Sequence, residues 1–176
     1  MAENQPSATP EVAWGEARHR EVSWHDPMTG AAVGRSLSGL DYLTAMLEGR
    51  LPPPPIAESL GFTLTRIGEG EAWFRCEPHE SHYNPIGMVH GGLVCTLLDS
   101  AIGCAAQTLL PAGVGYTSIE LKVSYLRPVS STSGPLVAHG WVTKPGRRVV
   151  FAEGAVRDGS DKVVATASGT CLVIGG

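Results

Sequence analysis

The sequence has little charge and no excess of basic residues. Only 17% of its 176 residues are charged and 43% are hydrophobic, which is typical of a globular chain and not of a disordered one. The formal net charge of −4 does not favour nucleic-acid binding. The length predicts one domain that is large enough to bury a sizeable core.

Cysteine is scarce, and the four cysteines form no C-x-x-C pair. Cys95 and Cys104 lie in an apolar stretch, which favours reduced thiols in the core of a cytoplasmic protein. The first residues, MAENQPSATPEVAWGE, contain no basic region followed by an apolar run, so we predict no signal peptide. Cys76, His79 and His82 have the spacing of metal ligands, but no fourth ligand accompanies them, and we predict no metal site.

The chain also lacks a convincing membrane-spanning run. The most apolar window, residues 93–110, contains Asp99 and several other polar residues, and basic flanking residues are missing. A buried helix explains this window better. A carboxylate on the buried part of a helix costs several kcal/mol unless it is paired or neutralised. Asp99 therefore requires a partner or a function, and one option is a carboxylate bonded to Ser or Thr neighbours at a subunit contact.

The first third of the chain contains one clear element. Residues 1–37, rich in Pro, Gly, Ser and charge, indicate a loosely held extension, in which DPMTG suggests the turn of a hairpin. Ser38 is placed to cap a short helix, GLDYLTAMLEG, with leucines on one stripe and Gly49 at its end. The prolines of LPPPP then predict an extended connector.

The remainder predicts an antiparallel sheet around one long helix. FTLTRI and AWFRC alternate and read as a hairpin, and an apolar helix follows from about Gly91 to Leu109. The later strands are YTSIELKVSYL, LVAHGWVT, RVVFAEGAVR and VVATASGTCLVI. In the first of these, alternation places Ile119, Leu121 and Val123 on one face. The short turns leave no room for parallel crossovers, and a sheet wrapped around the helix, aided by a second copy of the chain, would cover it.

The start of the long helix has features of a catalytic site. The two glycines of VHGG allow close approach to the backbone, and free N–H groups at a helix start attract negative charge, as in an oxyanion hole; a tight turn also explains them. Gly91 and Asp99 are eight residues apart, about 12 Å along a helix, so pairing them across a two-fold dimer suits one reacting carbonyl better. Asn84 fits ordinary turn chemistry, and His90 suits a residue that orients the loop better than one that transfers a proton.

The stretch HYNPIGMVHGGLVCTLLDSAIGCAA, followed by SIELKVSYLRPV, resembles the hotdog-fold acyl-CoA thioesterases of the phenylacetate-pathway (PaaI-type) branch. The resemblance covers about residues 56–174 and rests on an asparagine, a histidine six residues later, Gly-Gly, and an acidic residue nine after the histidine. It implies an α+β hotdog fold, with a curved antiparallel β-sheet wrapped around one long central α-helix. Residues 51–176 would form the hotdog thioesterase domain and residues 1–50 an N-terminal extension with a short helix.

The resemblance also implies residue roles. Asp99 would act on the thioester as nucleophile or as general base, and the backbone N–H of Gly91 would polarise its carbonyl. Asn84 and His90 of the opposite subunit would position the thioester or the attacking water. The family needs no metal and no cofactor, because coenzyme A is part of the substrate.

Further site residues follow from the same resemblance. A strand hydroxyl would hold the attacking water, and it belongs to Thr117 or Ser118, which alternation places on opposite faces. Candidates for binding coenzyme A lie in SYLRPV and in the tight basic turn TKPGRRVV, which a solvated turn explains equally well. They are Tyr125, Arg127, Lys144, Gly146, Arg147 and Arg148.

Two other functions compete with a cytoplasmic acyl-CoA thioesterase. A hotdog hydratase or dehydratase has an Asp two residues before Asn-Pro and a His two residues after the Pro, where this chain has His82 and Gly87. A non-catalytic acyl-CoA sensor does not need a costly carboxylate such as Asp99. The expected partners are acyl-CoA and a second copy of the chain, as a homodimer that pairs into a tetramer, with no nucleic acid and no membrane. The acyl group, aryl or fatty, stays open.

Overall fold

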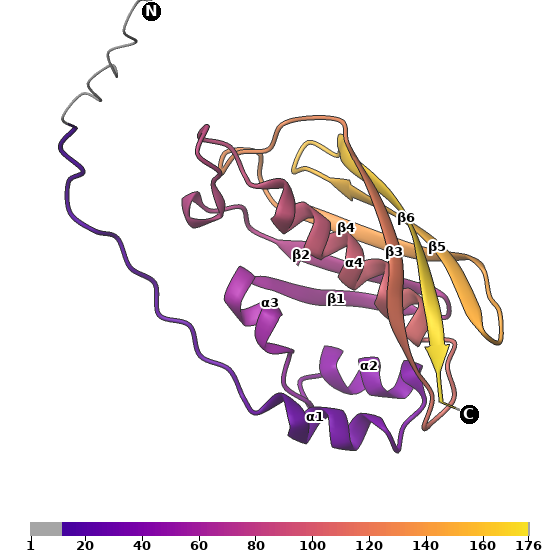
Figure 1. Cartoon of the computed structure of the whole chain (residues 1–176). Coiled ribbons are helices and arrows are strands. Elements are labelled where there is room, and N and C mark those ends of the chain that lie inside the picture. The colour runs from indigo at the N-terminus through magenta and orange to yellow at the C-terminus, as the bar shows by residue number, and fades with distance from the viewer. Residues whose placement is uncertain (1–11, 176) are drawn as a thin grey trace, which may run out of the picture.

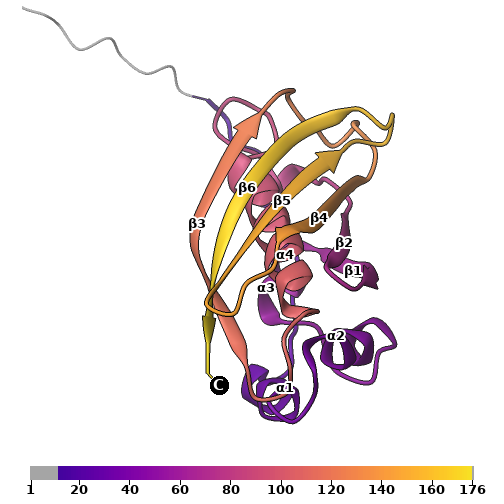
Figure 2. The ribbon, with the colours of Figure 1, turned by 90° about the vertical axis from the view of Figure 1, so that its right-hand side faces the viewer.

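The computed structural model describes residues 12–175 as a curved antiparallel sheet wrapped around one long helix (Figures 1 and 2). The prediction that no signal peptide is present, and part of the predicted extension, fall on residues 1–11, which lie outside the described residues. The helices are α1 (Pro27–Gly34), α2 (Gly39–Leu47), α3 (Pro55–Leu60), α4 (Gly91–Gln107) and the short 3-10 helix η1 (Glu80–His82). The strands are β1 (Phe62–Gly68), β2 (Glu71–Cys76), β3 (Gly115–Tyr125), β4 (Leu136–Lys144), β5 (Val149–Arg157) and β6 (Val163–Ile174).

All neighbouring strands in the sheet are antiparallel, in the order β1-β2-β4-β5-β6-β3. Short turns join β1 to β2, β4 to β5 and β5 to β6, and α4 lies in the concave face of the sheet (Figure 2). The predicted α+β hotdog fold is confirmed. Because β1 and β3 are the end strands, β3 presents a long free edge.

Helix α4 packs into the sheet so closely that one strand needs a glycine. Leu97, Leu98 and Ala101 of α4 are fully buried. Complete burial stabilises the fold by about 1.5–3 kcal/mol for each leucine. A Cβ on Gly140 of β4 would lie 2.3 Å from the carbonyl carbon of Ala101, so only glycine fits there. This contact fixes which side of α4 faces the sheet and which side is left uncovered.

The N-terminal extension contains more helix than the sequence predicted. The predicted hairpin around DPMTG is wrong, because these residues begin α1. The Asp26 side chain caps this helix by accepting a hydrogen bond from the Met28 N–H at 2.9 Å, and Pro27 takes the first helical position, where a missing N–H has no cost. Ser38 caps α2 as predicted, accepting from the Asp41 N–H at 3.1 Å.

The connection from α2 to the sheet also differs from the prediction. LPPPP is extended only as far as Pro54, and Pro55 begins α3, which was not predicted. Leu47, the last leucine of the predicted stripe on α2, is 38% exposed. Leu43 of the same helix is buried, so α2 packs onto the domain by a narrower face.

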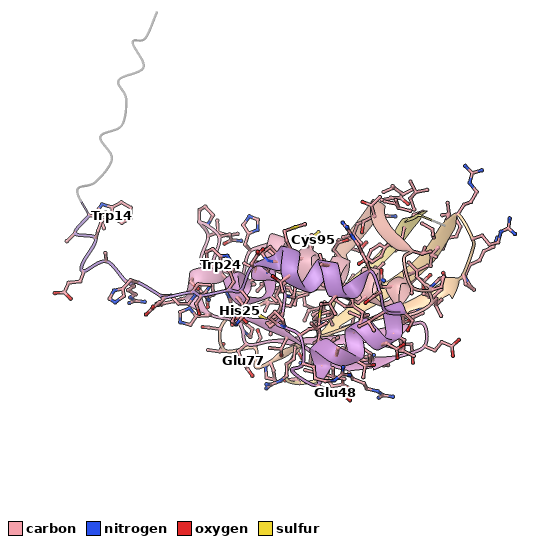
Figure 3. All side chains as sticks on the ribbon, turned by 90° about the horizontal axis from the view of Figure 1, so that it is seen from below. Trp14, Trp24, His25, Glu48, Glu77 and Cys95 are labelled. Carbon is pink, nitrogen blue, oxygen red and sulfur yellow. The ribbon has the colours of Figure 1, made fainter. Side chains whose placement is uncertain are left out.

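Residues 12–26 form neither helix nor strand. Two polar contacts tie them to the body: the Arg18 guanidinium pairs with Glu80 of η1, and Arg20 donates to the carbonyl of Ser59 in α3. Figure 3 shows Trp14 standing away from the helices and the sheet, and this side chain is almost fully exposed.

Strand β3 contains a β-bulge that the alternating sequence does not reveal. Ser118 pairs with Cys171 and Glu120 with Thr170, so Ile119 is an extra residue in β3. The extra residue shifts the side-chain alternation by one position. The prediction that Ile119 shares a buried face with Leu121 and Val123 is therefore wrong for Ile119, which is 56% exposed.

Candidate active site

The candidate site centres on Asp99, which is exposed on α4 next to the edge strand β3. The Ser118 hydroxyl of β3 donates a hydrogen bond to Asp99 Oδ1 at 2.8 Å. The premise that Asp99 is buried is wrong for the single chain, because its side chain is exposed. A carboxylate there has no large desolvation cost and is free to meet another molecule.

The bulge decides which of the two strand hydroxyls meets Asp99. Tyr116 and Ser118 face α4 before the bulge, and Leu121 and Val123 face it afterwards. Without the extra residue, Ser118 would lie on the outer face. Thr117 is exposed on that outer face. The sequence left both residues open, and the structure brings only Ser118 to Asp99.

The start of α4 is shaped by a histidine cap and two glycines. His90 Nδ1 accepts a hydrogen bond from the Gly92 N–H at 2.8 Å, so this imidazole has the structural role of an N-cap. Gly91 is the first residue of the helix and has no intrahelical acceptor for its N–H. Its carbonyl accepts from the Tyr125 hydroxyl at 2.9 Å, and a Cβ on Gly91 would lie 3.0 Å from the Tyr125 ring.

Asn84 holds the loop that leads into α4. Its Oδ1 accepts hydrogen bonds from the backbone N–H groups of Ile86 and Met88, both at 3.1 Å. Its own backbone N–H donates to the Met88 carbonyl at 2.7 Å. In the single chain Asn84 is thus a turn residue, which rigidifies the segment before the helix.

Next to this loop, His82 is buried and lacks one partner. Its Nδ1 accepts from the His79 N–H at 3.1 Å, whereas Nε2 has no hydrogen-bond partner among the described residues. Burial lowers the pKa of His82, and the positive charges of Arg20 and His79 lower it further. Within the described chain, Cys76, His79 and His82 do not belong to any cluster that suits a metal ion.

Two recesses meet at Asp99. A cleft of about 840 Å³ runs from Asp99 along the outer side of α4 and is bounded by α1, α2 and α3. A smaller recess of about 340 Å³ lies between α4 and β3, where Cys95, Asp99 and Ser118 line it. Because its carboxylate borders both, Asp99 can face the reacting centre of a ligand that occupies the two together.

The predicted coenzyme A residues lie in two separate places. Tyr125 ends β3 beside the start of α4, and the nearby Arg127 donates to the Val163 carbonyl. The basic turn lies beside the other end of β3. The Arg148 carbonyl accepts a hydrogen bond from the N–H of Val173 in β6, and Val173 is the strand partner of Tyr116 in β3. The length of β3, roughly 33 Å, separates the two groups within one chain.

The basic turn itself is open to solvent. Lys144, Arg147 and Arg148 are exposed and form no ion pair with any described residue. Gly146 is required for the turn, because a Cβ there would lie 2.3 Å from the Val149 carbonyl oxygen.

The sequence missed the residues that the N-terminal extension contributes to the cleft. Tyr42 and Met46 of α2 line it, together with Gln107 of α4 and Tyr116 of β3. One signal in the sequence could have indicated them. The helix predicted after Ser38 has an apolar face, which has to pack against another part of the domain. Among the described helices, none has both the length and the apolar character that crossing a bilayer requires.

Comparisons with known proteins indicate the family. A family model described as "Thioesterase superfamily" matches residues 86–165. A Halobacterium salinarum protein named "Putative esterase" is 34% identical in an alignment of 118 positions that covers 64% of this chain and 76% of that protein. Human acyl-coenzyme A thioesterase 13 is 29% identical over 89 residues, 51% of this chain and 62% of the human protein.

Solved structures resemble the fold. A phenylacetic acid degradation-related protein of Ralstonia eutropha superposes with a TM-score of 0.68 at 28% identity, covering 74% of this chain and 98% of that one. The E. coli PaaI protein of the phenylacetic acid degradation operon has a TM-score of 0.69 at 23% identity, covering 80% and 98%. The second likeness shows the fold alone.

We expect the buried His82 to make the fold sensitive to mild acid. Its pKa is lowered in the folded state, so the unfolded chain takes up a proton first as the pH falls below about 6.5. The stability that neutral His82 contributes is therefore complete above that pH and decreases below it. Urea unfolding at pH 7.5 and pH 5.0 should show a larger loss for the native protein than for His82→Asn, which keeps an acceptor near the Nδ1 position but does not titrate. An equal loss in both proteins would contradict this.

Proposed function

Because this chain belongs to the thioesterase superfamily and is a thioester hydrolase, we propose that it hydrolyses acyl-coenzyme A to the free acid and coenzyme A, with Asp99 as the reacting carboxylate. The observation that carries the proposal is the position of Asp99. It borders both recesses, is exposed, and accepts a hydrogen bond from Ser118 at 2.8 Å. The name of the human relative, acyl-coenzyme A thioesterase 13, supports acyl-CoA as the substrate class.

Asp99 can hydrolyse a thioester at this site by two routes. In the first, Asp99 takes a proton from water while the water oxygen bonds to the thioester carbon; the C–S bond then breaks and the proton passes to the thiolate. In the second, an Asp99 oxygen attacks the carbon itself, the thiolate leaves, and water hydrolyses the mixed anhydride. The Ser118 hydroxyl orients the carboxylate in both.

The oxyanion formed in either route needs a donor, for which we propose the free N–H of Gly91 at the positive end of α4. Gly91 and Asp99 of one chain are about 12 Å apart along the helix, too far to contact one carbonyl. A two-fold dimer that brings Gly91 of one chain to Asp99 of its mate removes this difficulty.

The free edge of β3 supports such a dimer. The strand has eleven residues, an unpaired row of backbone groups and an exposed Ile119, which together favour pairing with a second copy. In that assembly one site would be completed by two subunits. Tyr125 and Arg127 would come from one subunit, and the basic turn 144–148 would come from the other. The three cations of the turn suit the phosphates of coenzyme A.

The role of Asp99 predicts a graded loss of activity. Asp99→Asn should lower kcat for acyl-CoA hydrolysis at least about a hundredfold, the usual scale for a positioned base. Ser118→Ala should lower it about tenfold, since one hydrogen bond to a charged group is worth roughly 1.5 kcal/mol. Thr117→Ala, the matched control on the outer face, should stay within about twofold of the native value. Thiol release from a panel of aryl- and fatty acyl-CoAs measures all three.

A near-normal kcat for Asp99→Asn would refute the proposed role of this carboxylate. If the native protein binds acyl-CoA saturably and releases no thiol from any substrate, the sensor function replaces the enzyme.

The shared site predicts recovery of activity in a mixture of two inactive proteins. Asp99→Ala and Gly91→Pro proteins, mixed in equal amounts and allowed to exchange subunits, form mixed dimers in which one site is intact and the other has both defects. About a quarter of all sites should then be active, because half of the dimers are mixed. Proline suits the first position of a helix, and the exposed Tyr125 ring, which a Cβ there would approach to 3.0 Å, has to shift only slightly, so the Gly91→Pro chain is expected to fold.

Native mass spectrometry verifies the exchange in that mixture. If mixed dimers are present and no activity returns, each site is built within a single chain.

A further inference from the structure

The large cleft beside Asp99 has one wall formed by the N-terminal extension and by α3, the helix that follows it. Leu43 and Met46 of α2 and Ala57 of α3 form that wall, and Phe62 and Phe74 of the hotdog sheet form its floor. Figures 1 and 2 show α1 and α2 near the C-terminal end of α4. Residues of both helices line the cleft. The extension is therefore part of the candidate site.

Helix α2 is fixed firmly to the rest of the domain. The Gly39 N–H at its start donates to the Leu110 carbonyl just after α4, at 2.9 Å. A Cβ on Gly39 would lie only 1.7 Å from the Gln107 carbonyl oxygen, so the two helices meet there backbone to backbone. Further along α2, the side chains of Leu43 and Ala45 are buried. The wall is thus preformed, which suits a binding site better than a loose cover.

The interior of the cleft is uncharged. Only Asp99 and Arg35 are charged among the residues that line it, and both are exposed. Burial raises the pKa of Tyr42, of Tyr116 and of the Cys104 thiol, the last to about 12, so these groups stay neutral at ordinary pH. A ligand inside the cleft therefore meets apolar surface and neutral hydroxyl, thiol and amide groups.

We propose that α2 of the extension, together with the following helix α3, forms the acyl-binding site and selects a long aliphatic acyl chain. This inference rests on the proposed function, because it takes the scissile thioester to lie at Asp99. Pockets for drug-sized ligands measure about 300–1,000 Å³, and this cleft of about 840 Å³ is near the upper end. A phenylacetyl group, about the size of one Phe side chain, would leave most of it unfilled, whereas a medium or long fatty acyl chain occupies more of its apolar length.

Met46 allows the wall to be moved without touching the catalytic residues. Met46→Trp narrows the cleft, and Met46→Ala widens it. Leu47→Trp is the matched control, because Leu47 follows on the same helix, is exposed and does not line the cleft. Thermal unfolding checks that each variant is folded.

In the native protein we expect kcat/KM to rise at least tenfold from butyryl- to dodecanoyl-CoA, since buried methylenes favour binding. Met46→Trp should lower the dodecanoyl-to-butyryl ratio about tenfold and leave butyryl-CoA within about twofold. Met46→Ala should move the preference toward longer chains. Leu47→Trp should retain the native profile. The same chain-length profile in Met46→Trp and Leu47→Trp, or an equal preference of the native protein for phenylacetyl- and dodecanoyl-CoA, would overturn the inference.

A binding measurement separates this inference from the proposed function. Calorimetry with free dodecanoate needs no catalysis, and Met46→Trp should weaken its binding about tenfold relative to Leu47→Trp. If dodecanoate discriminates between these variants but no acyl-CoA is hydrolysed, the acyl site stands and the catalytic proposal fails. If hydrolysis depends on Asp99 but dodecanoate binds all variants equally, the catalytic proposal stands and the role of the extension is refuted.

Discussion

The close packing of α4 in the concave face of the sheet determines the rest of the architecture. Gly140 lets the backbone of β4 approach Ala101, and the leucines of α4 fill the space around this contact. Because the sheet occupies that face of α4, the opposite face of the helix has to be covered by another segment or left open to solvent. The extension covers part of that face near the C-terminal end of α4, and Asp99 lies where this cover stops.

A single extra residue in β3 then sets the chemistry of the uncovered face. Because Ile119 is inserted relative to β6, the hydroxyl of Ser118 points to Asp99 and the bulky Leu121 still returns to the core. A regular strand would place either the hydroxyl or the leucine on the wrong side. Bulges commonly re-aim one side chain next to an active site, and this one has that geometry.

Much of the fold was predictable because each strand after Phe62 alternates and is bounded by turn residues. Of the predicted site residues, the structure brings Ser118 to Asp99, whereas Asn84 and His90 make turn and cap hydrogen bonds at the start of α4 within one chain. The bulge was not predictable, since it depends on pairing with β6 and has no local sequence signal. The Asp26–Pro27 pair suits both a turn and a helix start, and only packing decides between them. The cleft was hidden because its walls come from segments far apart in the chain.

In the proposed binding mode, the extension and the hotdog core together hold one substrate. The acyl chain lies between α2 and α4, and the thioester lies at Asp99. The most direct test is a crystal structure with dodecyl-CoA thioether, which has no carbonyl to hydrolyse. We expect the alkyl chain beside Met46 and Leu43, and the carbon bonded to sulfur within contact of the Asp99 carboxylate. An alkyl chain outside this cleft, or a sulfur remote from Asp99, would contradict this binding mode.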